Sequence, residues 1–574
     1  MNIKKYVEEK LKKVFIKNGF DENYASVSFS DREGVHLQCN GAFAIAKSLK
    51  KNPIEIAETI KNSFLEECDE FEIEVAKPAF VNFKIKSELF SKLANNILKD
   101  ERVGVEKLSN PSTTVLDYGG ANVAKPLHVG HMRSAVIGEA IKRLNIFKGN
   151  KVISDAHLGD WGLQMGLTIA ELMDTYDFGG YFGEDKPKIK ITEKMLETAY
   201  PNANTKKKTD EEFAKRASDI TVWLQNKKAG YYEIWQEMRD VSIKMVKRIY
   251  SSLGTSFDLW NGESSVNDIV PTILKLFEDK KLSYESDGAK IVDVAIEGET
   301  EPMPPLLLQK SNGAQMYPLT EIATIYQRVR DFNPDKILYV TDFRQALHFK
   351  QVFRCVKKAG IVGDKPILTH IQFGTVNGKD GKPFKTRDGK VAGLEDLIDT
   401  ISDKALEKLK SSDKVQNPTK ELAMKIGVGA LIFGDLINVV SKDYIFDVDK
   451  FVNFEGKTGP YIQYSAVRIK SLLDKSDYKE SSIKIALPSQ EKVMMEVLKL
   501  INAYDVALEE NSLNALALGV YELASAYSTF YNDVKILKET DDVKRQSYLN
   551  FSRMVLKCIE NACNILAIEI PERM

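Results

Sequence analysis

The sequence predicts a multidomain α/β protein: a Rossmann-type parallel-sheet domain with a helical insertion, an N-terminal α+β domain and a C-terminal all-α helical bundle. Three observations lead to this fold class. Between residues 113 and 153, an apolar run, a glycine-containing loop, an amphipathic stretch and a second apolar run follow one another, as in a β-α-β crossover unit. The strand and helix pattern resumes at Ile337 after a long charged segment. From Glu421 onward, apolar residues recur at helical spacing.

Four domains follow from these patterns. The predicted boundaries are 1–105 for the N-terminal α+β domain, 106–395 for the Rossmann domain with its insertion at about 167–300, 396–450 for a helical connector and 451–574 for the C-terminal helical domain. Within the insertion, residues 201–210 are polar and contain three consecutive lysines. They predict a solvated connector between helices.

Periodicity predicts the individual elements. In the N-terminal domain, helices are expected at 3–15, 42–49 and 53–64, and strands at 71–75 and 80–85. In the Rossmann domain, strands are expected at 113–118, 152–153, 337–341 and 367–376, and helices at 130–147 and 346–358. Residues 128–131 therefore lie at the junction between the loop that follows the first strand and the first crossover helix.

Composition limits the class of protein. Lys and Arg number 81 and Asp and Glu 82, so a nucleic-acid partner would need a local basic face. Five scattered cysteines without Cys-x-x-Cys spacing argue against disulfides and against structural zinc. The first fifteen residues lack an apolar core, and no run approaches the about 18 apolar residues of a membrane span. We therefore expect a cytoplasmic protein without a membrane contact.

Two histidines three residues apart give the sharpest chemical signal. His128 and His131 flank Gly130 at the predicted start of the crossover helix. A helix N-terminus attracts phosphate, and imidazole donors can stabilise the charge on a transferring phosphoryl group. Gly130 lacks a Cβ and would let a flat base approach the backbone. The alternative is one capping and one core histidine, which the strand-loop-helix context makes the weaker interpretation.

A second loop, at 377–390, combines glycines with Lys379, Lys382, Lys385, Arg387 and Lys390. Cations on a glycine-containing loop suit a polyphosphate and could stabilise a transition state more than the ground state. A solvated hairpin is an equally good interpretation of this loop taken alone.

Longer sequence motifs resemble those of one family. Residues 128–131 resemble the HIGH signature of class I aminoacyl-tRNA synthetases, and 384–389 occupy the place of their KMSKS loop. The arginyl-tRNA synthetases are the members that the chain resembles, over nearly its whole length and in order. The words that carry this resemblance are 77–83 (KPAFVNF), 117–134 (DYGGANVAKPLHVGHMRS), 157–162 (HLGDWG), 345–349 (QALHF), 384–387 (FKTR), 454–464 (FEGKTGPYIQY) and 571–574 (PERM).

The resemblance implies an arginine–tRNA ligase. Such an enzyme uses ATP, accompanied by Mg²⁺, to form arginyl-adenylate and pyrophosphate, and then transfers arginine to the 3′ end of tRNA(Arg) for protein synthesis. Thr386 stands where class I enzymes commonly have the second KMSKS lysine, and Lys125 is expected to replace it. The implied catalytic residues are Lys125, His128, His131, Lys385 and Arg387, and the implied ATP-binding residues are His128, Gly130, His131, Phe384 and Lys385.

Binding of arginine and of tRNA is assigned by the same resemblance. A buried guanidinium needs carboxylates, because an unpaired charge is costly away from water. The implied arginine-binding residues are Asp117, Asn122, His131, Tyr317, Glu321 and Gln345. The N-terminal domain would contact tRNA through Phe80 and Asn82, and the C-terminal domain would bind the anticodon through Tyr461 and Tyr527. No protein-held metal is implied, and a monomer is expected.

Two rival functions remain. A class I synthetase for another amino acid would need a zinc set for cysteine, or a long editing insertion for a large aliphatic side chain. A non-catalytic tRNA-binding paralogue would have damaged histidines or lost pocket acids. His128, His131, Asp117 and Glu321 are all present.

Overall fold

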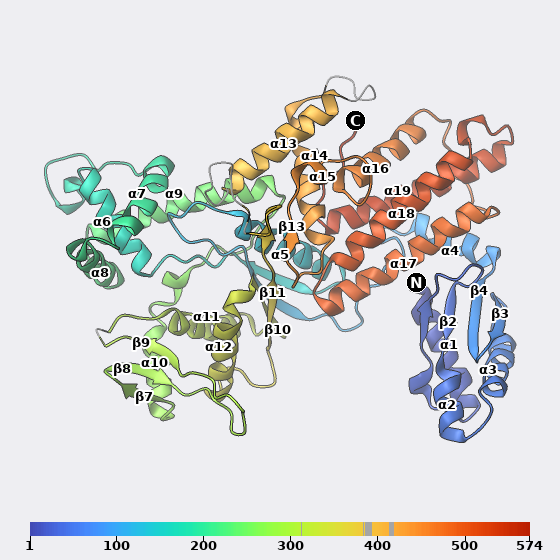
Figure 1. The fold of residues 1–574 in the computed structure, drawn as a ribbon, viewed down its shortest axis with the longest axis horizontal. Coiled ribbons are helices and arrows are strands. Elements are labelled where there is room, and N and C mark those ends of the chain that lie inside the picture. The colour runs from blue at the N-terminus through green and yellow to red at the C-terminus, as the bar shows by residue number, and fades with distance from the viewer. Residues whose placement is uncertain (312, 383, 385–392, 412–417) are drawn as a thin grey trace. The chain divides into compact units, whose positions relative to one another are not determined.

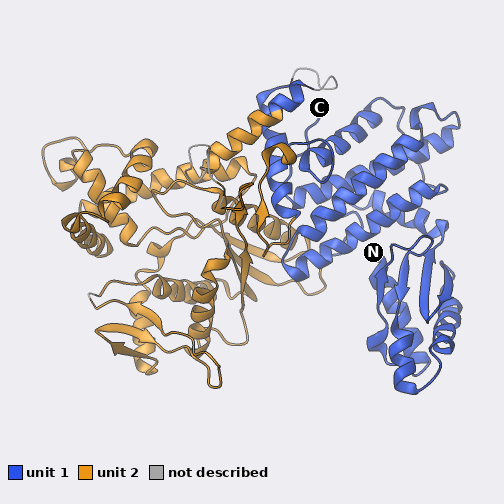
Figure 2. Ribbon diagram, viewed as in Figure 1, with its two compact units in different colours: residues 1–107, 406–437, 452–574 blue, residues 108–405, 438–451 orange. Residues whose placement is uncertain are grey.

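The computed structural model describes the chain except for residues 312, 383, 385–392 and 412–417 (Figure 1). The chain divides into two compact units (Figure 2). Unit 1 comprises residues 1–107, 406–437 and 452–574, and unit 2 comprises 108–405 and 438–451. Among the described helices, none has both the length and the apolar character that a membrane span requires.

Unit 2 is built on a four-stranded sheet in the order β11-β10-β5-β6, with all pairs parallel. Its strands are β5 Thr113–Tyr118, β6 Lys151–Asp155, β10 Lys336–Asp342 and β11 Ile367–Phe373. The associated helices are α5 Val129–Phe147, α11 Tyr317–Phe332 and α12 Ala346–Lys358. The parallel Rossmann-type sheet is therefore confirmed, and α12 has the predicted bounds.

Close packing of α5 on β5 requires a glycine. A Cβ on Gly138 would lie 2.1 Å from the ring of Tyr118. The hydroxyl of Tyr118 donates to Glu139 on the same helix at 2.8 Å. This contact fixes the helix directly over the strand whose carboxyl end leads into the histidine loop.

The insertion is mainly helical, as expected, with α6 Leu163–Thr175, α7 Glu193–Lys206, α8 Glu211–Gln225, α9 Tyr231–Ser252 and α10 Val270–Asp279. The connector predicted at 201–210 is wrong for its first half, because α7 continues through Pro201. Buried Leu196, Ala199 and Ala203 hold this helix, and Lys206 pairs with Glu171 of α6 at 2.6 Å. Packing of the helix thus outweighs the break that proline favours.

Two small groups of strands were not predicted from the sequence. β7 Ser283–Ser286, β8 Ala289–Val292 and β9 Leu306–Gln309 form an antiparallel sheet. The strand expected at 367–376 ends at Phe373, and a separate short strand, β12 Val376–Asn377, pairs with β13 Tyr444–Ile445. Helix α15 Val448–Phe451 follows β13, and α13 Leu394–Lys410 runs across the boundary of the two units.

Unit 1 contains the N-terminal α+β fold and the helical bundle. The four-stranded antiparallel sheet has the order β1-β2-β4-β3. The helices and strands of the N-terminal fold are α1 Ile3–Lys17, β1 Val27–Phe29, β2 Leu37–Cys39, α2 Gly41–Leu49, α3 Pro53–Glu67, β3 Phe71–Ala76, β4 Phe80–Ile85 and α4 Ser87–Lys99. The bundle consists of α14 Lys420–Leu436, α16 Gly459–Asp474, α17 Pro488–Glu510, α18 Asn514–Asp533 and α19 Asp542–Ile565. The predicted α+β and all-α parts are both confirmed.

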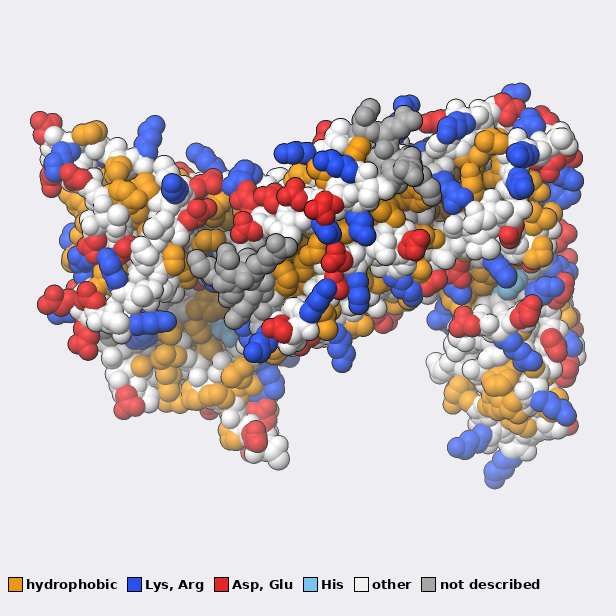
Figure 3. Space-filling model, turned by 45° about the horizontal axis from the view of Figure 1, so that its top comes forward, with side chains coloured by type: hydrophobic (Ala, Val, Ile, Leu, Met, Phe, Trp, Pro, Cys, Tyr) orange, Lys and Arg blue, Asp and Glu red, His pale blue; other side chains and the backbone are white. Residues whose placement is uncertain are grey.

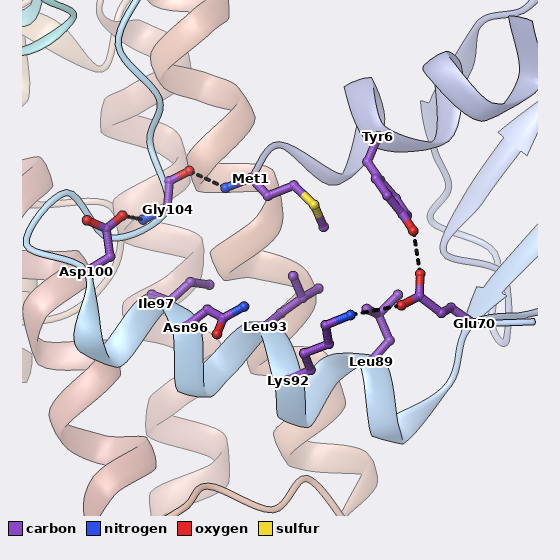
Figure 4. Close-up of a pocket in the computed structure, with 10 residues that line it drawn as sticks. All are labelled: Met1, Tyr6, Glu70, Leu89, Lys92, Leu93, Asn96, Ile97, Asp100 and Gly104. Carbon is purple, nitrogen blue, oxygen red and sulfur yellow. Dashed lines mark hydrogen bonds and ion pairs between the residues drawn. The ribbon is translucent and has the colours of Figure 1, made fainter. Parts of the chain in front are cut away.

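A cavity of about 220 Å³ lies in unit 1 beside α4 (Figure 4). Leu89, Leu93 and Ile97 supply its apolar wall. At its polar edge Glu70 accepts a hydrogen bond from the Tyr6 hydroxyl at 2.5 Å and one from Lys92 at 3.3 Å. Glu70 thereby joins α1 to α4 across the cavity.

Acidic and basic side chains are interspersed over the face of the molecule seen in Figure 3. This distribution matches the near-zero formal net charge of −1. A nucleic-acid partner would therefore have to be bound by local groups and not by the field of the whole chain.

Candidate active site

The two histidines cap the N-terminus of α5 and lie against each other. His128 is the N-cap residue, and its Nδ1 accepts a hydrogen bond from the Gly130 N–H at 3.2 Å. The Nδ1 of His131 accepts from the His128 N–H at 3.0 Å. The two ring centroids are 4.0 Å apart. A Cβ at Gly130 would lie 3.1 Å from the His128 ring, so glycine leaves room for this cap.

These hydrogen bonds fix the protonation of both rings. An Nδ1 atom that accepts from the backbone carries no proton, so the neutral ring has its proton on Nε2. Burial, helped by the positive charges of Lys125 and Arg344, lowers the pKa of His128 to about 4. Burial and then the neighbouring His128 lower the pKa of His131 well below its ordinary value. Both rings are therefore neutral Nε2–H donors at pH 7.

A cavity of about 700 Å³ opens in front of this cap, at the carboxyl ends of β5 and β10. Ligands of open parallel sheets bind at such an edge. The predicted site residues that line it are Asp117, Asn122, His128, Gly130, His131, Tyr317, Glu321 and Gln345. The structure thus brings all the predicted arginine-binding residues and the two histidines around one cavity.

The carboxylate of Asp117 is already engaged by a guanidinium of this chain. Arg328 on α11 donates through Nη2 to Asp117 Oδ2 at 2.6 Å and to Asp155 Oδ2 at 2.8 Å. Burial raises the pKa of Asp117 and the charge of Arg328 offsets part of that effect, for a net value of about 6. Asp155 also lies 3.5 Å from His157 Nδ1.

His157 stays protonated in this cluster. Burial is the largest single effect and lowers the pKa of His157, but the Asp155 carboxylate, 3.5 Å from Nδ1, outweighs it, and the net pKa is about 9. Two cations, Arg328 and His157, therefore balance Asp117 and Asp155 at the wall of the cavity, which Asp117 and His157 line.

Glu321 has unused binding capacity. It is 2% exposed, and its Oε1 has no hydrogen-bond partner among the described residues. Tyr317, Glu321, Thr324 and Arg328 are spaced by four, three and four residues on α11, so they share one helix face. That face aims Glu321 into the cavity, where a cationic ligand would satisfy it.

Glu263 is a cavity residue that the sequence prediction missed. Burial, followed by the negative charge of Asp160, raises its pKa to about 7, and the charge of Glu321 acts in the same direction. The residue lies in a 3₁₀ turn, Glu263–Val266, within the insertion. A single acid in a turn has no pattern of its own, so only the three-dimensional arrangement identifies it.

Lys125 lies in the strained loop before the cap. Ala124 has a φ of +64°, a conformation that residues with a Cβ rarely adopt, and its N–H donates to Ser242 Oγ at 3.0 Å. Lys125 is half-buried, and burial lowers the pKa of its ammonium group.

Of the second loop, Phe384 is described and Lys385 and Arg387 lie outside the described residues. The ring of Phe384 packs on Phe446 with a centroid distance of 5.0 Å. Its contact with ATP stays a prediction.

Two of the four predicted tRNA contacts involve side chains that are almost fully buried. Asn82 is 3% exposed and accepts a hydrogen bond from Gln38 Nε2 at 2.8 Å. Tyr527 is 2% exposed, and its hydroxyl bonds to Ser552 Oγ at 2.9 Å. The structure therefore assigns both side chains to packing, and their contacts with tRNA stay predictions. Phe80 and Tyr461 are partly exposed and remain candidates.

We expect Tyr527→Phe to lower the free energy of unfolding by about 1 kcal/mol, because the buried Ser552 oxygen loses the hydrogen bond that the Tyr527 hydroxyl donates and keeps only its own bond to the Tyr548 carbonyl. The KM for tRNA should not change. Chemical denaturation and aminoacylation kinetics measure the two quantities. Tyr461→Ala is the comparison, and its KM for tRNA should rise if its ring stacks on a base. A tRNA defect in Tyr527→Phe alone would contradict this assignment.

The described residues contain no group of three or more His, Cys, Asp or Glu side chains that could hold a metal. Near the histidines, the Asp342 carboxylate is engaged by Arg344 at 2.6 and 2.8 Å. This donor set does not fit an ion held by the protein. The expected Mg²⁺ would therefore be coordinated by the phosphates of ATP, and no protein step is assigned to it.

Three family models match successive parts of the chain. The chain matches the family model "tRNA synthetases class I (R), catalytic domain" over residues 92–448. It also matches the "Arginyl tRNA synthetase N terminal domain" over 1–85 and the "DALR anticodon binding domain" over 462–574.

Full-length relatives and solved structures extend the match. The arginine–tRNA ligase of Agathobacter rectalis is 42% identical, with 99% of each chain covered, and that of Alkaliphilus oremlandii is 41% identical, with 98% of each covered. The fold resembles Plasmodium falciparum arginyl-tRNA synthetase, with a TM-score of 0.83, 24% identity and coverage of 100% and 99%. The Thermus thermophilus arginyl-tRNA synthetase gives 0.81 at 20% identity, with both chains fully covered.

The parallel sheet, the capped histidine pair and the matched catalytic model together define the architecture of class I aminoacyl-tRNA synthetases. Within that class, the chain belongs to the arginyl-tRNA synthetase family.

Proposed function

We propose that this protein is an arginine–tRNA ligase that activates arginine with ATP and transfers it to tRNA(Arg). The observation that carries the proposal is that unsatisfied Glu321 and the neutral His128–His131 pair face one cavity. The first group suits a guanidinium, and the second suits phosphate oxygens.

Activation requires positioning and charge stabilisation. A carboxylate oxygen of arginine attacks the α-phosphorus of ATP, and the bond from that phosphorus to the bridging oxygen breaks, releasing pyrophosphate. His128 and His131 donate from Nε2 to phosphate oxygens, and Lys125 neutralises developing charge. Lys385 and Arg387 remain the proposed additional cations. No protein nucleophile takes part in this step.

The pose of arginine follows from the charges. Since Arg328 occupies Asp117, we assign the guanidinium to Glu321 and Glu263, beside Tyr317. This revises the sequence-based pairing of Asp117 with Glu321. We assign Asp117 and Asn122, near the loop before α5, to the α-amino group of the substrate arginine. Gln345 supplies a further polar contact with the same substrate.

Binding of arginine should strengthen as pH rises from 6 to 8. Glu263, with a pKa of about 7, carries a proton below that pH, and the neutral acid attracts a guanidinium less well. Asp160 and Glu321 keep the pKa high, and His157 opposes them. Calorimetric Kd values across this range measure the slope. Glu263→Gln should flatten it, and a flat wild-type profile would exclude the proton linkage.

Transfer to tRNA completes the proposed reaction. A hydroxyl of the 3′-terminal adenosine attacks the carbonyl carbon of the adenylate and displaces AMP. The matched anticodon-binding model supports tRNA as the partner. The monomeric state, the cytoplasmic location and the absence of structural zinc stay predictions.

The deciding experiment is ATP–pyrophosphate exchange with each amino acid, with and without tRNA. We expect exchange with arginine. We also expect this exchange to depend on tRNA, as the family resemblance implies. Exchange with a different amino acid would overturn the arginine assignment. Binding of tRNA without exchange or charging would favour the non-catalytic paralogue.

A further inference from the structure

Arg133 belongs to the histidine-loop motif, but the reaction proposed above gives it no role. It lies on α5, two residues after His131, and is 1% exposed. A guanidinium that is removed from water needs hydrogen-bond partners of its own. The identity of those partners suggests what Arg133 does.

The Arg133 guanidinium contacts backbone carbonyls from two distant segments. Its Nη1 donates to the Gly374 carbonyl at 2.8 Å and to the Lys442 carbonyl at 3.2 Å, and its Nη2 donates to the Val440 carbonyl at 3.3 Å. The group also lies 5.1 Å from the ring centroid of Tyr444 and 5.7 Å from that of Phe373. The planar fork of arginine allows these contacts at once, and a lysine could not make all of them.

One of these segments leads from the sheet toward Phe384, and the other leads into the strand that pairs with it. Gly374 follows the end of β11, and β12 then pairs with β13. The Phe384 N–H donates to the Val376 carbonyl at 3.0 Å. Arg133 therefore connects the start of α5 to the β12 strand, whose Val376 carbonyl binds Phe384.

The chain after the loop is tied to the same place. Gly393 forms an antiparallel bridge with His128, and the Leu394 N–H donates to the Leu127 carbonyl at 2.9 Å. The described residues on both sides of the second loop are thus attached to the start of α5, on one side through Arg133 and on the other through the backbone.

We propose that Arg133 is a positioning residue for ATP, which holds the β12–β13 pair and Phe384 in register with His128 and His131. This inference rests on the proposed function and adds a residue to it. Arg133 itself touches backbone and rings of the protein, so it acts on ATP through the elements it joins. Its loss should affect the nucleotide and spare the arginine pocket, whose acids lie on α11 and in the insertion.

The test compares Arg133→Met with Arg133→Lys. In tRNA-dependent pyrophosphate exchange, we expect Arg133→Met to raise the KM for ATP, or to lower kcat, about tenfold or more, since small misplacements of reacting groups are costly. The Kd for arginine, measured by calorimetry, should change less than about twofold. Arg133→Lys should recover part of the ATP defect because it restores the charge and some donors.

Arg143→Met is the matched control, because Arg143 lies on the same helix and donates to Glu139 and to the Gly254 carbonyl. It should leave the KM for ATP unchanged. Unchanged ATP kinetics in Arg133→Met would overturn the proposal, as would an equal loss of arginine affinity. If Arg133→Met does not fold, Arg133→Lys and Tyr444→Leu must show the ATP-selective defect. If neither variant shows that defect, the proposal is wrong. Wild-type protein without arginine-dependent exchange would instead refute the proposed function.

Discussion

Glu321→Gln is expected to raise the Kd for arginine about 100-fold, or about 2.7 kcal/mol. The substitution keeps the shape of the side chain but removes the negative charge whose Oε1 has no partner among the described residues. A substrate guanidinium would then be buried beside a neutral amide. Calorimetry with arginine measures the loss directly, without the other substrates.

The control for this substitution is Glu285→Gln, which removes an exposed carboxylate from β7 in the same unit. Its Kd for arginine should equal that of the unmodified protein. Glu263→Gln should weaken binding as well, because the proposed guanidinium site uses both acids. Unchanged arginine affinity in Glu321→Gln would remove α11 from the substrate site.

His131→Asn is expected to lower the kcat of adenylate formation by about 100- to 1,000-fold, the effect of removing one preorganised donor. The asparagine side chain can still accept a hydrogen bond near the position of Nδ1, where His131 receives the His128 N–H. It cannot place a donor at the position of Nε2. Pyrophosphate exchange measures the activity, and thermal unfolding checks that the helix cap survives.

His131→Gln separates the two roles of the ring. Its amide nitrogen can reach the Nε2 position, so it should retain more activity than His131→Asn while losing the cap. If His131→Asn were fully active, the phosphate role of His131 would be wrong. If both variants failed equally and unfolded early, the ring would be a capping group only.

Local signals in the sequence were sufficient for the histidine loop and the central sheet. The strand at 113–118, the glycine-containing loop and the helix after it lie within forty residues, and each has its own periodicity. Tyr317 and Glu321 were assigned by resemblance to the family, and the structure places them one turn apart on α11. Short-range patterns of this kind survive folding unchanged.

Long-range partners were out of reach of the same reasoning. Arg328 pairs with Asp117 across 211 positions of the chain. No local sequence pattern around either residue predicts this ion pair. Glu263 is a single acid in a turn. Tyr527 and Asn82 look like surface polar residues until packing buries them, and β12 is too short for an alternating pattern.

The uncharged state of the two capped imidazoles has a consequence for turnover. A cationic clamp would attract pyrophosphate as strongly after the reaction as ATP before it, and product release would be slow. Neutral donors bind by directional contacts that fit one geometry of the phosphates and are lost when that geometry relaxes. Departure of the leaving group should therefore depend little on His128 and His131 and mainly on the basic side chains around them.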